Sequence, residues 1–220
     1  MTSFATVNDI PVLSGSIVLP RSGAWSASLT LDTDAAPSGS VSLATDEGET
    51  VYRGTVVRAA EVFGRVEVLL VGGAGGLATT LAPKRYLGVT VRLAWQAILT
   101  DAGETGSTAS DEAVLGRQLA GWTRLRETAG TCLQQLAAHV GAVWRIGLDG
   151  TVRLSTAGAT ETVKRSGDLL LDSCPADASA LYALAALDLE PGQTLDGRRV
   201  SRLAHDIRAG SIRSKVWFDG

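Results

Sequence analysis

The stretch from Trp122 to Leu154 constrains the fold more than any other, because its pattern predicts a helix that leads directly into a β-hairpin. The hydroxyls of Thr128 and Thr131 can cap a helix, and apolar residues then recur at helical spacing. These residues are Cys132, Leu133, Leu136, Ala137 and Val140. They form one stripe that needs a packing partner, and Gly141 is expected to end the helix.

A β-hairpin is predicted immediately after this helix. Apolar residues alternate along two runs, namely Trp144, Ile146 and Leu148 in the first and Val152 and Leu154 in the second. Between the runs, Asp149 and Gly150 supply the positive-φ pair of a tight turn. A helix and a hairpin of this size cannot bury enough apolar surface alone, so we expect flanking β structure to pack against them. The side chains expected in the shared core are Trp144, Ile146, Leu136 and Val140.

The composition describes a folded chain without a polyanion-binding surface. Its 220 residues are 45% hydrophobic, which is enough for a core and allows one large or two small domains. The formal charge is −3, and 17 of the 20 basic residues are arginine, a bias that favours protein interfaces over nucleic acid. Cys132 and Cys174 lack the spacing of metal ligands, so we expect reduced, structural thiols. The sequence shows no secretory signal pattern and no apolar run of the roughly 18 residues that span a bilayer, which favours a cytoplasmic site of synthesis.

Short β-like runs separated by turn residues predict a small barrel or sandwich over residues 1–95. The runs lie at residues 25–31, 41–43, 51–58, 65–71 and 87–95, with a turn at Asp46-Glu47-Gly48. Apolar and polar residues alternate from Trp25 to Leu31, which is the period of a strand with one buried face. The residues from Trp95 to Leu99 favour a helix that ends at Gly103.

Residues 103–110, GETGSTAS, predict a polar surface linker, after which Ser110 can cap a short helix through Asp111 and Glu112. Further strands are predicted at residues 168–172, 181–189, 198–206 and 211–218. The turn signals between them are Gly167, Pro191-Gly192, Asp196-Gly197 and Ala209-Gly210. The alanine-rich residues 181–189 favour a helix by composition and a strand by position, and we predict a strand.

The predicted fold is therefore mainly β (α+β). Two small β-barrel-like segments, residues 1–95 and 159–220, flank a central helix-hairpin unit at residues 96–158 that includes the linker.

One loop, VGGAGGLA, matches a dinucleotide-binding fingerprint at Gly73, Gly75 and Ala78, and Asp101 lies where a ribose-binding acid would be sought. Pro83 comes too early for the helix that this motif requires, and no alternation of strands and helices follows. We therefore expect a flexible glycine-rich hairpin loop without a cofactor.

No set of residues predicts catalysis or metal binding. His139 and His205 are the only histidines, and neither has the spacing to a cysteine or carboxylate that a metal or an activated nucleophile needs. The paired acids fall at turns and indicate solvated positions: Asp32 with Asp34, and Asp46 with Glu47 and Glu49. Three tryptophans fall on alternating apolar faces and indicate core packing rather than a sugar-stacking surface, namely Trp25, Trp95 and Trp144.

Three stretches together resemble the baseplate or tail hub proteins of tailed bacteriophages. They are TDAGE from Thr100 to Glu104, GWTRLRETAGTCLQQLAAHVGAVWRIGLDGTVRL from Gly121 to Leu154, and LEPGQTLDGRRVSRLAHDIRAGSIRSKVWF from Leu189 to Phe218. The likeness lies in their order: an apolar helix, a Trp-Arg strand with an Asp-Gly hairpin, then a Pro-Gly turn before a strand with a histidine and a final arginine-rich hairpin. It implies two small β-barrels of the tail-tube kind joined by an inserted α/β portion.

The resemblance also implies a homotrimeric ring around the tail axis, with a tail tube protein above it, a spike or tail-tip protein below it and no enzymatic activity. It places the protein in the virion tail or baseplate after assembly in the host bacterial cytoplasm, without a membrane-spanning segment or specific nucleic-acid binding. Other hypotheses are a virion-associated carbohydrate-binding module or hydrolase and an unrelated cellular β protein, and a ring of six chains stays open beside a ring of three. We expect residues 72–76 and 103–110 to contact neighbouring subunits, because glycine-rich segments without apolar anchors are mobile until a partner covers them.

Overall fold

The computed structural model describes residues 5–45, 50–157, 164–165, 169–184, 187–208 and 211–219. Three predicted turns lie outside these residues, at Asp46-Glu47-Gly48, Gly167 and Ala209-Gly210, and so do the acids Asp46, Glu47 and Glu49. Strands dominate the described chain, which confirms the mainly β fold class.

The first third of the chain forms a closed barrel of six antiparallel strands. Its strands are β1 (Ala5–Val7), β2 (Ile10–Pro20), β3 (Ser26–Leu31), β4 (Ser40–Thr45), β5 (Thr50–Val62) and β6 (Arg65–Gly72). The barrel closes because β1 pairs with both β2 and β4. Trp25 fills the interior, with its ring edge-on to Tyr52 at 5.6 Å, and the backbone of Gly72 lies so close to the indole that a Cβ would come within 2.5 Å of it.

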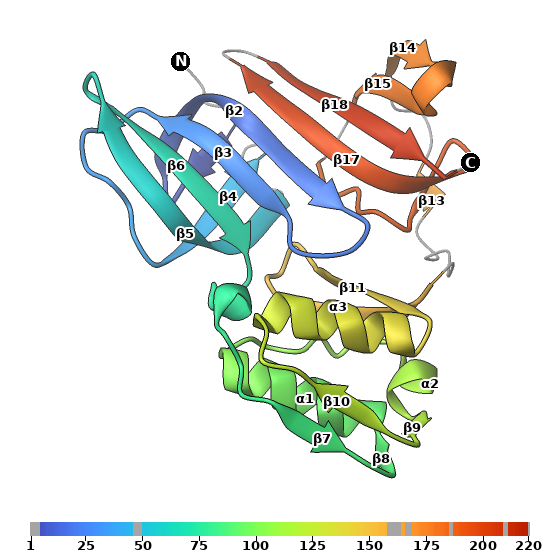
Figure 1. Cartoon of the computed structure of the whole chain (residues 1–220). Helices are drawn as coiled ribbons and strands as arrows, with labels where there is room; N and C mark the ends of the chain where they lie inside the picture. The colour runs from blue at the N-terminus through green and yellow to red at the C-terminus, as the bar shows by residue number, and fades with distance from the viewer. Residues whose placement is uncertain are drawn as a thin grey trace.

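The last part of the chain continues the barrel sheet instead of standing apart from it. β17 (Arg198–Arg208) pairs with β2 on one side and with β18 (Ser211–Phe218) on the other. The sheet then runs through β15 (Ser179–Ala183) to β14 (Leu169–Cys174), while β16 (Thr194–Leu195) joins β17 to β13 (Lys164–Arg165). A short 3-10 helix, η3 (Pro175–Asp177), connects β14 to β15. One sheet therefore spans both β segments (Figure 1). Its part outside the barrel, the strands β13–β18, is called the second sheet.

A helical unit lies beside the barrel and the second sheet (Figure 1). Its helices are η2 (Gly76–Ala78), α1 (Val91–Ala102), α2 (Glu112–Leu115) and α3 (Ala129–His139). Its strands pair two by two: β7 (Lys84–Tyr86) with β10 (Trp122–Arg124), β8 (Val89–Thr90) with β9 (Gln118–Leu119), and β11 (Ala142–Ile146) with β12 (Val152–Thr156). Among the described residues, no helix has the length and apolarity to cross a membrane.

The predicted helix and hairpin are confirmed. Thr128 caps α3 by accepting a hydrogen bond from the backbone N–H of Thr131, and Gly141 follows the helix with a φ of 65°. Three of the side chains predicted for the shared core, Trp144, Leu136 and Ile146, are buried in it, and the fourth, Val140, is partly buried and packs against it. Trp25 and Trp95 are likewise buried, which confirms the core packing predicted for these tryptophans.

The strand predicted at residues 87–95 is wrong for most of its length. Thr90 caps α1 through its hydroxyl, so the chain becomes helical at Val91. Apolar residues then recur at helical spacing and are buried: Val91, Ala94, Trp95, Ile98, Leu99 and Ala102. The predicted end at Gly103 is confirmed, because Gly103 terminates α1 with a φ of 73°.

Two predicted local features differ in the structure. Asp111 caps α2 in place of Ser110, because its carboxylate accepts from the backbone N–H of Ala113 and Val114. Ser110 instead accepts a hydrogen bond from the Leu154 backbone. In the β11–β12 hairpin only Gly150 has a positive φ, so the loop is wider than a two-residue turn, with the Gly147 N–H bonded to the Thr151 carbonyl.

The later strands agree with prediction except at residues 181–189. β15 covers Ser179–Ala183, so the strand assignment is right for its first residues, while residues 187–189 belong to no strand and residues 185–186 lie outside the description. Asp196 and Gly197 both have positive φ, of 50° and 78°, and form the tight turn between β16 and β17.

Candidate functional site

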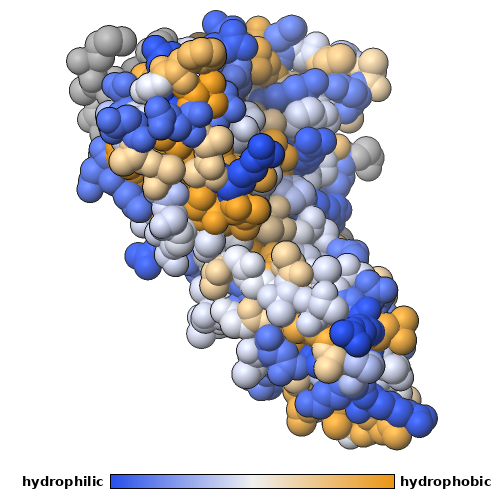
Figure 2. All heavy atoms as spheres, turned by 60° about the vertical axis from the view of Figure 1, so that its left-hand side comes forward, coloured by the Kyte–Doolittle hydropathy of each residue, from blue (hydrophilic) through white to orange (hydrophobic). Residues whose placement is uncertain are grey.

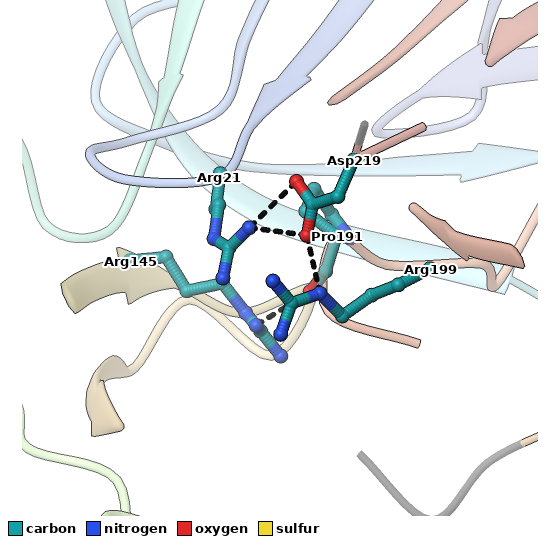
Figure 3. Close-up of polar contacts among 5 residues, drawn as sticks. All are labelled: Arg21, Arg145, Pro191, Arg199 and Asp219. Carbon is teal, nitrogen blue, oxygen red and sulfur yellow. Dashed lines mark hydrogen bonds and ion pairs between the residues drawn. The ribbon is translucent and has the colours of Figure 1, made fainter. Parts of the chain in front are cut away.

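The candidate functional site is a polar junction where the barrel, the helical unit and the second sheet meet (Figure 3). Arg21 comes from the loop after β2, Arg145 from β11, Arg199 from β17, and Asp219 follows β18. Four segments that are distant in the sequence thus place charged side chains at one point.

Asp219 binds two of these arginines. Its carboxylate accepts hydrogen bonds from Arg21 Nη1 at 2.7 Å and 2.6 Å and from Arg199 Nε. Partial burial acts to raise the pKa of Asp219, but the hydrogen bonds and the positive charges of both arginines outweigh it and hold the pKa below its usual value. The carboxylate therefore joins the end of β2 to the end of the second sheet.

Arg145 joins the helical unit to the segment before β16. Its Nη1 donates to the Pro191 carbonyl at 2.6 Å, and its Nε lies 3.3 Å from Glu190 Oε2. Both side chains are largely buried, Arg145 at 7% exposure and Glu190 at 13%. Because a buried charge is costly without its partner, this pair fixes the geometry of the joint more than it adds net stability.

Backbone hydrogen bonds extend the joint between the helical unit and the barrel. The Gly23 N–H donates to the Trp144 carbonyl at 2.8 Å, and the Ile146 N–H donates to the Gly23 carbonyl at 3.1 Å. The Arg53 N–H of β5 donates to the Leu148 carbonyl at 2.7 Å. The β11–β12 hairpin is therefore held against the barrel at two places.

Glu104 makes a second joint, between the loop after β6 and the loop after α1. Its Oε2 accepts from the Ala74 N–H at 2.9 Å, and its Oε1 accepts from the Gly76 N–H at 2.8 Å. The Thr55 hydroxyl donates to the Gly73 carbonyl at 2.9 Å on the other side of the first loop. A Cβ on Gly76 would lie 1.8 Å from the Ala102 carbonyl oxygen, so this contact requires glycine.

This joint excludes the dinucleotide hypothesis. The N–H groups of the loop, which would have to face a pyrophosphate, are occupied by the Glu104 carboxylate. Asp101 is bound to Arg124 at 2.7 Å. The motif ends in the three-residue 3-10 helix η2, and the next element is the strand β7 rather than a helix. The predicted hairpin loop is also wrong, because the segment links β6 to the helical unit rather than to a paired strand.

The linker at residues 103–110 is not the unanchored surface loop that its composition predicts. Glu104 and Ser110 are buried, and the Val152 N–H donates to the Thr105 carbonyl at 2.8 Å. The Ser107 N–H donates to the Val152 carbonyl at 2.8 Å. The segment packs along β12 as an irregular neighbouring strand.

The two histidines lie on different elements. His139 is exposed at the end of α3, whereas His205 is buried in β17 with its Nδ1 2.7 Å from the Ser214 Oγ. This histidine and serine contact each other, and both are fully buried. The acids Asp32 and Asp34 are exposed after β3, as predicted for a solvated turn.

The thiols and the remaining tryptophans add no reactive group to the junction. Cys132 is buried, and burial raises the pKa of its thiol, whereas Cys174 is exposed on β14. Trp122 and Trp217 are half-buried, and Trp217 lies between Arg202 and Lys215. In the part of the chain that the structure describes, no three His, Cys, Asp or Glu residues come together as metal ligands.

Sequence reasoning did not predict the charged residues of either joint: Arg21, Glu104, Arg145, Glu190, Arg199 and Asp219. The excess of arginine over lysine was the available signal, and part of it serves contacts between segments of one chain. The chemistry of the site is that of ion pairs and hydrogen bonds that hold three structural parts in a fixed arrangement.

No protein family model and no curated protein sequence matches the chain. Solved structures do match it over nearly its whole length. The E. coli c3393 protein matches with a TM-score of 0.72 and 11% identity, over 98% of this chain and 77% of that one. That protein is described as a component of the type VI secretion system with structural similarity to the T4 bacteriophage tail proteins gp27 and gp5.

Two tail proteins match in the same way. The 43 kDa tail protein of prophage MuSo2 from Shewanella oneidensis gives a TM-score of 0.68 and 11% identity, over 98% of this chain and 95% of that one. The tail protein from Neisseria meningitidis MC58 gives 0.64 and 12% identity, over 98% and 96%. The chain shares the β-rich fold of these tail proteins.

Proposed function

We propose that this chain is a structural component of a bacteriophage tail or baseplate, a hub protein that forms a ring between the tail tube and the central spike or tip. The observation that carries the proposal is the likeness of fold to two tail proteins over 98% of the chain. In this proposal the protein has no enzymatic activity and resides in the virion tail after assembly in the host cytoplasm.

The ring we propose is a homotrimer. Each chain contributes two β segments, the closed barrel and the second sheet, so three chains would present six β units to a sixfold tube. Symmetry matching of this kind lets every unit meet an equivalent partner surface. The two joints described above suit this role, because a subunit that transmits contacts from tube to spike must keep its parts in register.

The alternative of a carbohydrate-binding module has little support. Sugar-binding sites present aromatic rings to solvent, whereas Trp25 and Trp144 are 1% and 4% exposed. A hydrolase would need an accessible pair of acids or an accessible histidine with a base or nucleophile. The His205 and Ser214 pair is closed to substrate.

Electron microscopy tests the proposed function at two levels. Antibodies against the chain should label the distal end of the tail in particles of the parent phage, and the purified protein at micromolar concentration should form threefold rings. Label on the capsid, label along the whole tail tube, or a monomer that persists when the tail tube and spike proteins are present would each contradict the proposal.

A further inference from the structure

The continuous sheet has two open edges that belong to the same chain. β14 ends the sheet, and among the described residues it pairs with β15 alone. On the far side of the barrel, β4 covers β5 only as far as Thr55, so residues 57–62 of β5 pair with β6 and with no second described strand. The two edges lie on opposite sides of the molecule, with β14 at the upper right and the β5–β6 hairpin at the upper left of Figure 1.

Both edges expose apolar side chains. On β14, Leu169, Leu170 and Leu171 are 64%, 52% and 44% exposed. On the β5–β6 hairpin, Val57 is 58% exposed and the tip residue Phe63 is fully exposed. Figure 2, which turns the hairpin side forward, shows apolar atoms gathered over the barrel part of that face. Open edges of this character bind other strands unless something covers them.

The two edges match each other in length, irregularity and charge. β14 is six residues long, and residues 57–62 make a stretch of the same length. Each edge contains a break in register, between Leu170 and Asp172 on β14 and between Val56 and Arg58 on β5. Next to these breaks, β14 carries the exposed acid Asp172 and β5 carries the exposed base Arg58.

We propose that β14 of one copy pairs with residues 57–62 of β5 in the next copy, so that the sheet continues from subunit to subunit. The proposal rests on the proposed function, since it assigns the contact that closes the hub ring. The occupant of each edge is a second copy of this chain, because one chain presents both edges and a closed head-to-tail ring leaves neither exposed. The leucines of β14 would then cover Val57 and Leu69, and Asp172 would face Arg58.

Cysteine cross-linking tests this seam, the pairing of β14 in one copy with residues 57–62 of the next. In a background in which Cys174→Ser removes the exposed thiol, Leu170→Cys is combined in turn with Ala59→Cys, Ala60→Cys, Glu61→Cys or Val62→Cys. In paired strands only directly opposed residues have Cβ atoms within about 4.5–5.5 Å, and residues two positions along lie about 7–8 Å away. One of the four variants, the one opposite Leu170→Cys, should therefore form a disulfide between copies under mild oxidation far more readily than the other three. The covalent products should stop at the size of the ring.

Leu93 provides the matched control. It is an apolar residue with 49% exposure, but it lies on α1 and away from both edges. Leu93→Cys with Leu170→Cys should give no ladder, and each β5 cysteine alone should give none, because the contact joins two different surfaces. Leu170→Lys should raise the concentration needed for assembly by more than about tenfold, while Leu93→Lys should leave it unchanged.

The outcomes separate the seam from the hub function. The protein could form rings at the tail end that show no cross-link at any β5 position and that persist with Leu170→Lys. This result would overturn the seam and leave the hub function standing. A ladder that forms at one favoured β5 position, from a protein that never labels the tail, would support the seam and overturn the hub function. Cross-linking at all four positions alike, or equally with Leu93→Cys, would indicate random collision and overturn the pairing.

Discussion

The side chain of Glu104 holds Gly76 through a hydrogen bond of 2.8 Å from the Gly76 N–H to Oε1. The same carboxylate binds the Ala74 N–H, so a single buried acid ties two glycine-rich loops together inside one chain. Hydrogen bonds inside one chain therefore hold the two loops together and link the helical unit to the barrel. Contact of these loops with a neighbouring subunit stays a prediction.

Hydrogen exchange of the isolated chain should be slow at the amides of Ala74 and Gly76. Each amide donates to a buried acceptor, and exchange then requires local opening of the joint. Mass spectrometry or NMR at neutral pH measures the protection. Gly75 is exposed, and its amide should exchange fast as the control. Equally fast exchange at all three amides would show that Glu104 does not hold the loop.

Glu104→Gln should destabilise the protein by about 1–3 kcal/mol, because the new amide group faces a backbone donor and leaves it unsatisfied. Urea unfolding at pH 7 gives the free energy of unfolding. The control is Glu112→Gln, whose side chain is 70% exposed and pairs with Arg92 at the surface, so its change should stay within about 0.5 kcal/mol. Equal effects of the two substitutions would show that Glu104 is not buried as described.

Gly76→Ala should be strongly destabilising, by more than about 3 kcal/mol, because its methyl group would overlap the Ala102 carbonyl and force the joint apart. Gly121→Ala is the control, since its methyl group would meet only the end of the flexible Leu87 side chain, at 3.3 Å. Thermal and urea unfolding compare the two variants. A Gly76→Ala protein as stable as the control would mean that the two loops do not approach each other.

Trp144→Ala should cost about 3–5 kcal/mol, the range for a large aromatic ring removed from a core. The ring is 4% exposed and its Nε1 donates to Gln134 Oε1 at 3.1 Å, so α3 and the hairpin share this contact. Gln134→Ala should cost about 1–2 kcal/mol, because it removes this hydrogen bond and the one that Gln134 Oε1 accepts from the Ser22 hydroxyl at 2.9 Å. A loss below about 1 kcal/mol for Trp144→Ala would show that helix and hairpin do not share a core.

The sequence predicts the elements whose pattern is local. The alternation from Trp25 to Leu31 and the stripe of α3 reflect one buried face each, and both are found. Residues 87–95 fit both periods, since Val89, Val91 and Leu93 alternate while Val91, Ala94 and Trp95 lie on one helical face. The Thr90 cap decides between them, and alternation alone does not reveal it.

The joints were beyond prediction for a different reason. Arg21 and Asp219 are 198 residues apart, and their contact depends on β17 pairing with β2. No spacing in the sequence encodes such a pair. The glycine content of residues 72–76 indicates only how the segment can bend. It does not reveal the acid that anchors this loop, because Glu104 lies about 30 residues further on, in the second loop.

Asp219→Asn should destabilise the protein in a way that depends on pH. The pKa of Asp219 is lowered in the folded state, so its contribution to stability is fully present above its unfolded pKa of about 3.9 and is lost as pH falls through the lower folded pKa. The difference in unfolding free energy between the wild type and the variant should therefore be constant from pH 7 to about pH 5 and shrink below about pH 4. Added salt should reduce this difference at neutral pH, because the carboxylate is partly exposed.

Asp34→Asn is the control for Asp219→Asn. Asp34 is exposed and has no ion pair with any described residue, so its difference in unfolding free energy should be small at every pH. A difference for Asp219→Asn that grows as the pH falls would reverse the sign expected of a carboxylate held by two arginines and would show that Asp219 does not join β2 to the second sheet.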